Sequence, residues 1–193
     1  MPNRVNRLCP VGGGRPWGGF DSLAACGHEM GMTTDPEAAA PPPLKILVDA
    51  DACPVREECV RVALRHQVPI TFISNSFMRI EDDPLVGREI VPGNFDAADD
   101  RIVELTTTAS VIVTADILLA ERCIKAKASA VIGPTGKPFT EASIGMAVAT
   151  RSIMADLRAG GSVVGGPAPF SRQDRSRFLS ALDLALVRHK RGS

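Results

Sequence analysis

The sequence predicts an α/β protein, a three-layer sandwich in which helices cover both faces of a mainly parallel sheet of about five strands. From residue 44 onward, short apolar runs alternate with longer segments of helical periodicity, which is the order of strand–helix–strand units. Hydrophobic residues make up 45% of the 193 residues, enough for a core. Aromatic residues make up only 4%, with no Tyr, so the predicted core is built from Val, Ile, Leu and Ala.

Residues 1–43 differ in composition from the rest of the chain. They contain Gly12-Gly13-Gly14 and Pro41-Pro42-Pro43 and show no sustained periodicity, so we expect them to be disordered or a mis-called N-terminal extension. Met30 and Met32 offer later translation starts. We expect residues 44–193 to form a single domain that ends in helices.

The first half of this domain is predicted to hold three strands and a helix. Leu44–Val48 is an apolar run that ends at Asp49, which is typical of a buried strand. Pro54 suits the first turn of a helix that continues to Gln67. The strands expected next are residues 69–74 and 88–91, joined by an irregular connection over residues 75–84.

The second half alternates helices with short strands. Residues 96–109 are expected to be helical, with Ile102, Val103 and Leu105 facing inward. Ser171 with Asp174 resembles a capping box in which Asp replaces the usual Glu, and it predicts a helix start. The remaining expected elements are strands at residues 111–114 and 130–132 and helices over residues 116–127, 140–159 and 171–190.

The distribution of charge and the number of cysteines favour some classes of protein over others. Residues 44–150 carry 11 basic and 15 acidic side chains, whereas residues 151–193 carry 8 basic and 3 acidic ones. This distribution suits a metal together with a phosphate-bearing ligand, and equally suits ordinary solvated helix surfaces. Five cysteines without a CxxC pair disfavour a disulfide framework and a zinc ribbon. No apolar run reaches about 18 residues, so a cytoplasmic protein is expected.

Aspartates follow the ends of three predicted strands. Asp49 and Asp51 follow the first strand, Asp96 and Asp99 the third, and Asp116 the fourth. Ligands of open parallel sheets bind outside the carboxyl ends of the strands. Crowded carboxylates repel one another and favour a hard cation such as Mg²⁺ or Mn²⁺, which can align water for phosphodiester attack. These five aspartates are therefore the candidate catalytic residues.

Each aspartate also has a purely structural interpretation. Asp is a preferred N-cap, and Asp51, Asp96 and Asp116 each precede a predicted helix. Asp99 falls in a first turn, where the helix dipole favours a negative charge. Capping does not explain why a carboxylate also ends the first strand at Asp49. Both interpretations stay open.

Other residues are weaker candidates. Cys53 lies near a helix N-terminus, which can lower a thiol pKa, but we favour a packing role because Cys59 stands where a phosphatase loop needs Arg. Residues 133–137 lack P-loop spacing and are expected to form a turn. Phe170 and Phe178 are expected in the core, so no aromatic stacking platform is apparent. The candidates for phosphate contact are Arg151, Arg158, Arg172, Arg175 and Arg177.

Several ordered motifs resemble the bacterial YaiI/YqxD family of uncharacterised proteins. The resemblance covers about residues 45–187, nearly all of the predicted domain. The motifs are Val48–Pro54, Gly93–Asp99, Val113–Asp116, Gly165-Gly166-Pro167 and Asp174-Arg175.

That family is similar in turn to the PIN-like nuclease superfamily, whose members cleave RNA or DNA with Mg²⁺ or Mn²⁺. There, one Asp ends the first strand, one opens a helix of the form Asp-x-x-Ile, and one follows a Thr after a later strand. The resemblance implies that Asp49, Asp99 and Asp116 are metal ligands. PIN domains usually carry a further acid, for which Asp51 or Asp96 is the candidate here.

Three functions follow from these observations. The favoured one is a metal-dependent nuclease acting on RNA or DNA phosphodiesters. The second is a haloacid-dehalogenase-like phosphatase, in which Asp49 of Asp49-Ala50-Asp51 is the nucleophile, although the acidic pair required late in the sheet is missing. The third is a non-catalytic module that binds RNA through its basic C-terminal helices.

Overall fold

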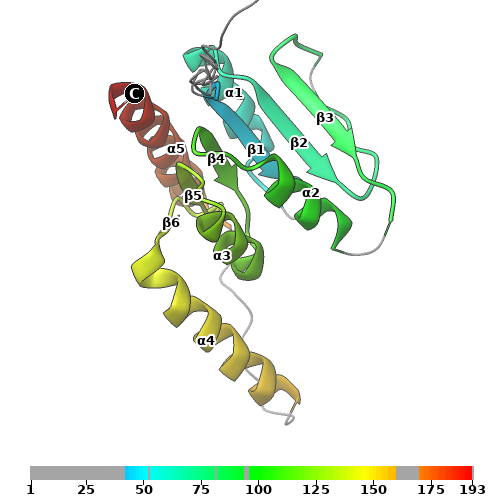
Figure 1. Ribbon diagram of the computed structural model, residues 1–193, viewed down its shortest axis with the longest axis vertical. Helices are drawn as coiled ribbons and strands as arrows, with labels where there is room; N and C mark the ends of the chain where they lie inside the picture. The colour runs from blue at the N-terminus through cyan, green and yellow to red at the C-terminus, as the bar shows by residue number, and fades with distance from the viewer. Residues whose placement is uncertain (1–41, 52, 81, 94–95, 160–169, 193) are drawn as a thin grey trace, which may run out of the picture. The chain divides into compact units, whose positions relative to one another are not determined.

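A computed structural model describes residues 42–51, 53–80, 82–93, 96–159 and 170–192, without the Arg158 side chain. Its centre is a six-stranded sheet of order β3-β2-β1-β4-β5-β6 (Figure 1). The first five strands in the chain run parallel, and β6 pairs antiparallel with β5. The predicted α/β fold with a mainly parallel sheet is thus confirmed, with six strands instead of about five.

The bounds of the elements follow the predicted order. The strands are β1 Lys45–Asp49, β2 Ile70–Ser74, β3 Val86–Ile90, β4 Ser110–Val113, β5 Ala130–Ile132 and β6 Pro138–Phe139. The helices are α1 Arg56–His66, α2 Ala97–Leu105, α3 Ile117–Lys125, α4 Glu141–Ala159 and α5 Arg172–Gly192.

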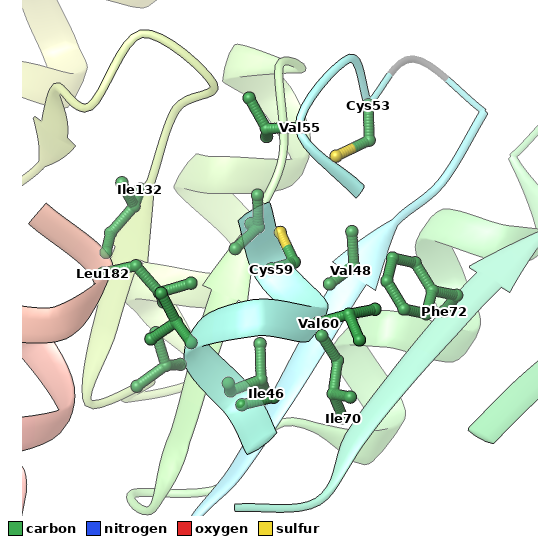
Figure 2. Packing of buried hydrophobic residues seen from close by; sticks show 14 of the residues in the cluster. Ile46, Val48, Cys53, Val55, Cys59, Val60, Ile70, Phe72, Ile132 and Leu182 are labelled. Carbon is green, nitrogen blue, oxygen red and sulfur yellow. The ribbon is translucent and has the colours of Figure 1, made fainter. Parts of the chain in front are cut away.

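Successive residues of the central strand β1 pack against opposite faces of the sheet, as the period of two in a strand requires. Ile46 and Val48 belong to a buried cluster with residues of α1 and α5, part of which Figure 2 shows. Leu47 belongs to a second cluster with residues of α2 and α3. Helices therefore cover both faces, and the core is built mainly from aliphatic side chains.

Two differences from the predicted elements have local causes. The helix expected to reach residue 109 ends at Leu105, because Thr106 adopts an extended backbone and its Oγ1 donates to the Ile102 carbonyl at 2.8 Å. β6 was not predicted: it has two residues, one of them a proline, and too little pattern to recognise. It belongs to a hairpin with β5 in which the Gly133 amide donates to the Lys137 carbonyl.

Other expectations concern helix starts and membrane spans. The capping box is confirmed, because the Asp174 amide donates to Ser171 Oγ at 3.2 Å and the Ser171 amide donates to Asp174 Oδ2 at 2.9 Å. No helix among the described residues is long and apolar enough to cross a membrane. The expected disorder of residues 1–43 and the Gly165-Gly166-Pro167 motif fall on positions outside the described residues, except for residues 42–43.

The register of the sheet brings the candidate residues to one edge. Asp49 pairs with Ile73 of β2, while Val48 pairs with Val113 of β4. The last residue of β1 therefore lies between the carboxyl ends of its two neighbours. Thr114 directly follows β4 and lies beside Asp49. The aspartates that follow the parallel strands therefore lie near the same edge of the sheet.

Candidate metal centre

Asp49 is the most buried of the described aspartates at this edge. It is the last residue of β1 and only 7% exposed. Its Oδ2 accepts a hydrogen bond from the Thr114 hydroxyl at 2.8 Å. Burial raises the pKa of Asp49, the Thr114 hydrogen bond opposes that effect, and the charges of Asp51 and Asp116 raise it further. A buried carboxylate held next to other acids is costly unless something compensates its charge.

Thr114 joins two of the aspartates. Its hydroxyl donates to Asp49, and the same oxygen accepts the backbone N–H of Asp116 at 2.9 Å. Thr114 is 1% exposed, so its hydrogen bond to Asp49 is buried, and the hydrogen bond from the Asp116 amide is partly buried. Thr114 therefore fixes the end of β1 relative to the start of α3. This positioning role was not predicted, although Thr114 was part of a recognised motif.

Asp116 is the N-cap of α3, as its structural interpretation predicts. Its Oδ1 accepts the Leu118 N–H at 2.7 Å, which satisfies one of the free donors at the start of α3. The same oxygen accepts a hydrogen bond from Arg151 Nη1 of α4, also at 2.7 Å. The side chains of Arg151 and Asp116 are 45% and 32% exposed, so this ion pair is open to solvent. Asp116 thus already has a positive partner.

Asp99 lies in the first turn of α2, and the charges of other acids affect its pKa. Its pKa is raised from 3.8 to about 6, first by partial burial and then by the charges of Asp49 and Asp116. Arg122 opposes this effect. Three carboxylates from β1, α2 and the start of α3 therefore lie close enough to repel one another. We call Asp49, Asp99 and Asp116 the aspartate cluster.

The other two predicted acids lie at the margin. Asp96 occupies the N-cap position of α2, but its side chain makes no capping hydrogen bond and is exposed. The N-cap of α1 is Val55, so the interpretation of Asp51 as a cap of the first helix is wrong. Asp51 Oδ2 instead accepts the backbone N–H of Asn75 at 3.0 Å, which ties the loop after β1 to the end of β2.

The ligand atoms of the aspartate cluster suit a divalent cation, but the carboxylates are not arranged to surround one. Carboxylate oxygens are the ligands that Mg²⁺ and Mn²⁺ prefer. Among the described residues, however, no three His, Cys, Asp or Glu side chains are grouped as a ready set of ligands. Asp116 Oδ1 is directed to Leu118 and Arg151. Binding of an ion by all three carboxylates therefore requires a rearrangement of the cluster.

The arginines proposed for phosphate contact separate into different places. Arg151 contacts the aspartate cluster. Arg175 instead pairs with buried Glu58 at 2.7 Å and covers the Phe170 ring, and Arg177 pairs with Asp174. Arg172 is exposed on α5 and the Arg158 side chain is not described.

The remaining weaker candidates have structural roles. Cys53 is buried in the cluster between the sheet and α1, as the packing interpretation predicts, and lies near Cys59 (Figure 2). Phe178 is fully buried and Phe170 packs against the same cluster. Phe77, which the sequence analysis did not single out, is 71% exposed.

Comparison with known proteins points to a family without an assigned activity. A family model described as "Uncharacterized BCR, YaiI/YqxD family" matches residues 47–188. A UPF0178 protein of Sphingopyxis alaskensis is 64% identical over 148 residues, which is 76% of this chain and 96% of that protein. A UPF0178 protein of Bradyrhizobium diazoefficiens is 54% identical over 149 residues, 77% of this chain and 89% of that protein. No solved structure matches.

Proposed function

The chain belongs to the uncharacterised YaiI/YqxD family, so its chemistry has to be argued from the site, and we propose that it is a metal-dependent nuclease acting on RNA or DNA. One observation carries the proposal. Asp49, Asp99 and Asp116 come from three separate segments, and partial burial, followed by the charges of Asp49 and Asp116, raises the pKa of Asp99 to about 6. Helix capping explains Asp116 but gives no reason for a repulsive group of three acids.

The aspartates and their neighbours divide the work of such a site. Burial and the Thr114 hydrogen bond hold Asp49 in one position. Asp99 and Asp116 add negative oxygens from the starts of two helices. A bound Mg²⁺ or Mn²⁺ would supply charge stabilisation and water activation for phosphodiester cleavage. Arg151 pairs with Asp116 in the absence of metal, and in this proposal it contacts a substrate phosphate once the pair separates.

The resemblance to PIN-like nucleases supports the same assignment from the order of the motifs. Asp49 ends a strand, Asp99 lies in the first turn of a helix with Ile102 three residues later, and Asp116 follows Thr114. The phosphatase alternative gains no comparable support. Asp51, the second acid of its signature, is exposed and bonded to the Asn75 backbone.

The experiment compares cleavage of end-labelled single-stranded RNA and DNA with Mn²⁺, with Mg²⁺ and with EDTA. Asp49→Asn and Asp116→Asn are the test variants, because Asn keeps the shape and an acceptor oxygen while removing the charge. Asp156→Asn is the matched control, since Asp156 is exposed on α4. We expect metal-dependent cleavage by wild type and control, and losses of about 100-fold or more in the test variants.

The proposal is rejected if wild type cleaves neither substrate with either metal. It is also rejected if all variants cleave equally, which would indicate a contaminating nuclease. Hydrolysis of phosphomonoesters without cleavage of nucleic acid, together with a phosphorylated Asp49, would identify the phosphatase instead.

A further inference from the structure

Two hollows adjoin on the side of the sheet that α1 covers, near the edge strand β3. The first, of about 460 Å³, lies between α1 and the β2–β3 connection. The second, of about 370 Å³, lies between that connection and β3. Arg79 and Ile80 line both, so the two hollows adjoin on this surface. We call the surface formed by the two hollows the arginine groove.

The groove is positively charged. Among the described residues, the side chains that line it include four arginines, Arg56, Arg61, Arg79 and Arg88, and two acids, Glu57 and Asp82, an excess of two positive charges. Within the described part of the chain, none of these four arginines forms an ion pair with an acid. Their charges are thus available to an anionic ligand. Apolar side chains, among them Val60 and Ile80, form part of the lining.

An exposed aromatic ring stands in the same groove. Phe77 is 71% exposed, and the Arg88 guanidinium lies over its ring at 4.7 Å from the centroid. Arg88 also donates to the Met78 carbonyl at 3.1 Å, which holds the connection in place. A single exposed aromatic side chain needs no ligand to explain it, so Phe77 matters here only together with the arginines beside it. An aromatic ring beside unpaired arginines is the combination that binds unpaired bases and their phosphates.

The β2–β3 connection, which lines part of the groove, begins at the carboxyl edge of the sheet that also carries the aspartate cluster. The β2–β3 connection starts at Asn75, whose backbone N–H donates to Asp51. Ser74 Oγ donates to the Ser76 carbonyl at 2.7 Å and shapes the turn that follows. Phe77 is the next residue of this connection. A strand bound along the groove would therefore have one end directed to the carboxyl edge of the sheet.

We propose that the arginine groove binds single-stranded nucleic acid, with phosphates on Arg61 and Arg79 and a base stacked on Phe77. The ligand is single-stranded because a base within a duplex cannot present its face to an exposed ring. The claim that this strand is the substrate rests on the proposed nuclease function. Binding itself does not, so it is measured without metal.

The experiment measures the affinity of a fluorescent 12-nucleotide oligo(U) by anisotropy, in EDTA and at several salt concentrations. Arg61→Gln/Arg79→Gln removes two groove charges from exposed side chains, and Phe77→Ala removes the ring. Arg172→Gln/Arg188→Gln is the matched control, because it removes the same charge from exposed positions of α5. Phe77→Trp preserves an aromatic platform. Thermal melts verify that each variant is folded.

We expect the groove double variant to lower the slope of log affinity against log salt by about 1.4. Phe77→Ala should weaken binding by about 5- to 100-fold, and Phe77→Trp should preserve it. The control pair and a competing RNA duplex should have little effect.

The proposal is overturned if the control pair weakens binding as much as the groove pair, which would place the strand on α5. It is also overturned if Phe77→Ala binds normally or if the duplex competes equally. Tight binding without any cleavage would support the groove and reject only the nuclease.

Discussion

Replacing Asp99 with asparagine should stabilise the metal-free protein at neutral and alkaline pH. Folding raises the pKa of Asp99 to about 6, first through partial burial and then through Asp49 and Asp116. Below pH 3.8 the carboxyl is protonated in both the folded and the unfolded chain, so its titration costs no stability. As pH rises from 3.8 to about 6, ionisation increasingly favours the unfolded chain, and above about 6 the cost is constant. The neutral amide removes this cost.

The size of the effect follows from the same shift. A rise from 3.8 to about 6 corresponds to an upper limit of about 3 kcal/mol, at about 1.36 kcal/mol per pKa unit. Asp99 is only half-buried, so solvent screening reduces this to about 1 kcal/mol. For a domain of this size, about 1 kcal/mol corresponds to a rise of about 2–4 °C in melting temperature.

The assay is thermal unfolding in EDTA at pH 8 and pH 4, with Asp100→Asn as the matched control. Asp100 is exposed on the same helix and pairs with Arg122 at 2.5 Å, so its replacement should bring no gain. The Asp99→Asn gain should appear at pH 8 and shrink towards zero at pH 4. Equal gains at both pH values, or no gain at pH 8, would refute the argument that the cluster is electrostatically strained.

Two further predictions concern the neighbours of the cluster. Thr114→Val removes the buried hydroxyl that bonds both Asp49 and the Asp116 amide, and should lower the unfolding free energy in urea by about 1–3 kcal/mol, while Thr114→Ser stays near wild type. A loss as large in the serine variant would mean that the methyl group matters instead. Arg151→Gln frees Asp116 from an exposed ion pair and should tighten Mn²⁺ binding by up to about 5-fold in calorimetry, whereas weaker binding would show that Arg151 supports the site in another way.

The sheet was predictable because its central strands β1 and β4 carry apolar runs, such as Val111–Val113, and each of these two runs is followed by helical periodicity. The end of α2 was harder to place, since the inward pattern continues to Leu105 and the helix ends where Thr106 adopts an extended backbone. The two-residue β6 carries no period at all and is defined by its pairing with β5.

For the candidate site, the sequence predicted which strand ends carry aspartates. The contacts of those side chains were not, because their partners come from distant segments: Arg151 reaches Asp116 from α4, and Asn75 reaches Asp51 from the end of β2. Phe77 was missed for a related reason. In an irregular connection no periodicity separates a buried ring from an exposed one, and only the folded chain shows its 71% exposure.

The most direct test is a crystal structure of the protein grown with Mn²⁺, in which anomalous scattering locates the ion. We expect one Mn²⁺ bound by Asp49, Asp99 and Asp116, with Arg151 released from Asp116. An absent anomalous peak at saturating Mn²⁺, or a peak bound away from these three carboxylates, would contradict it.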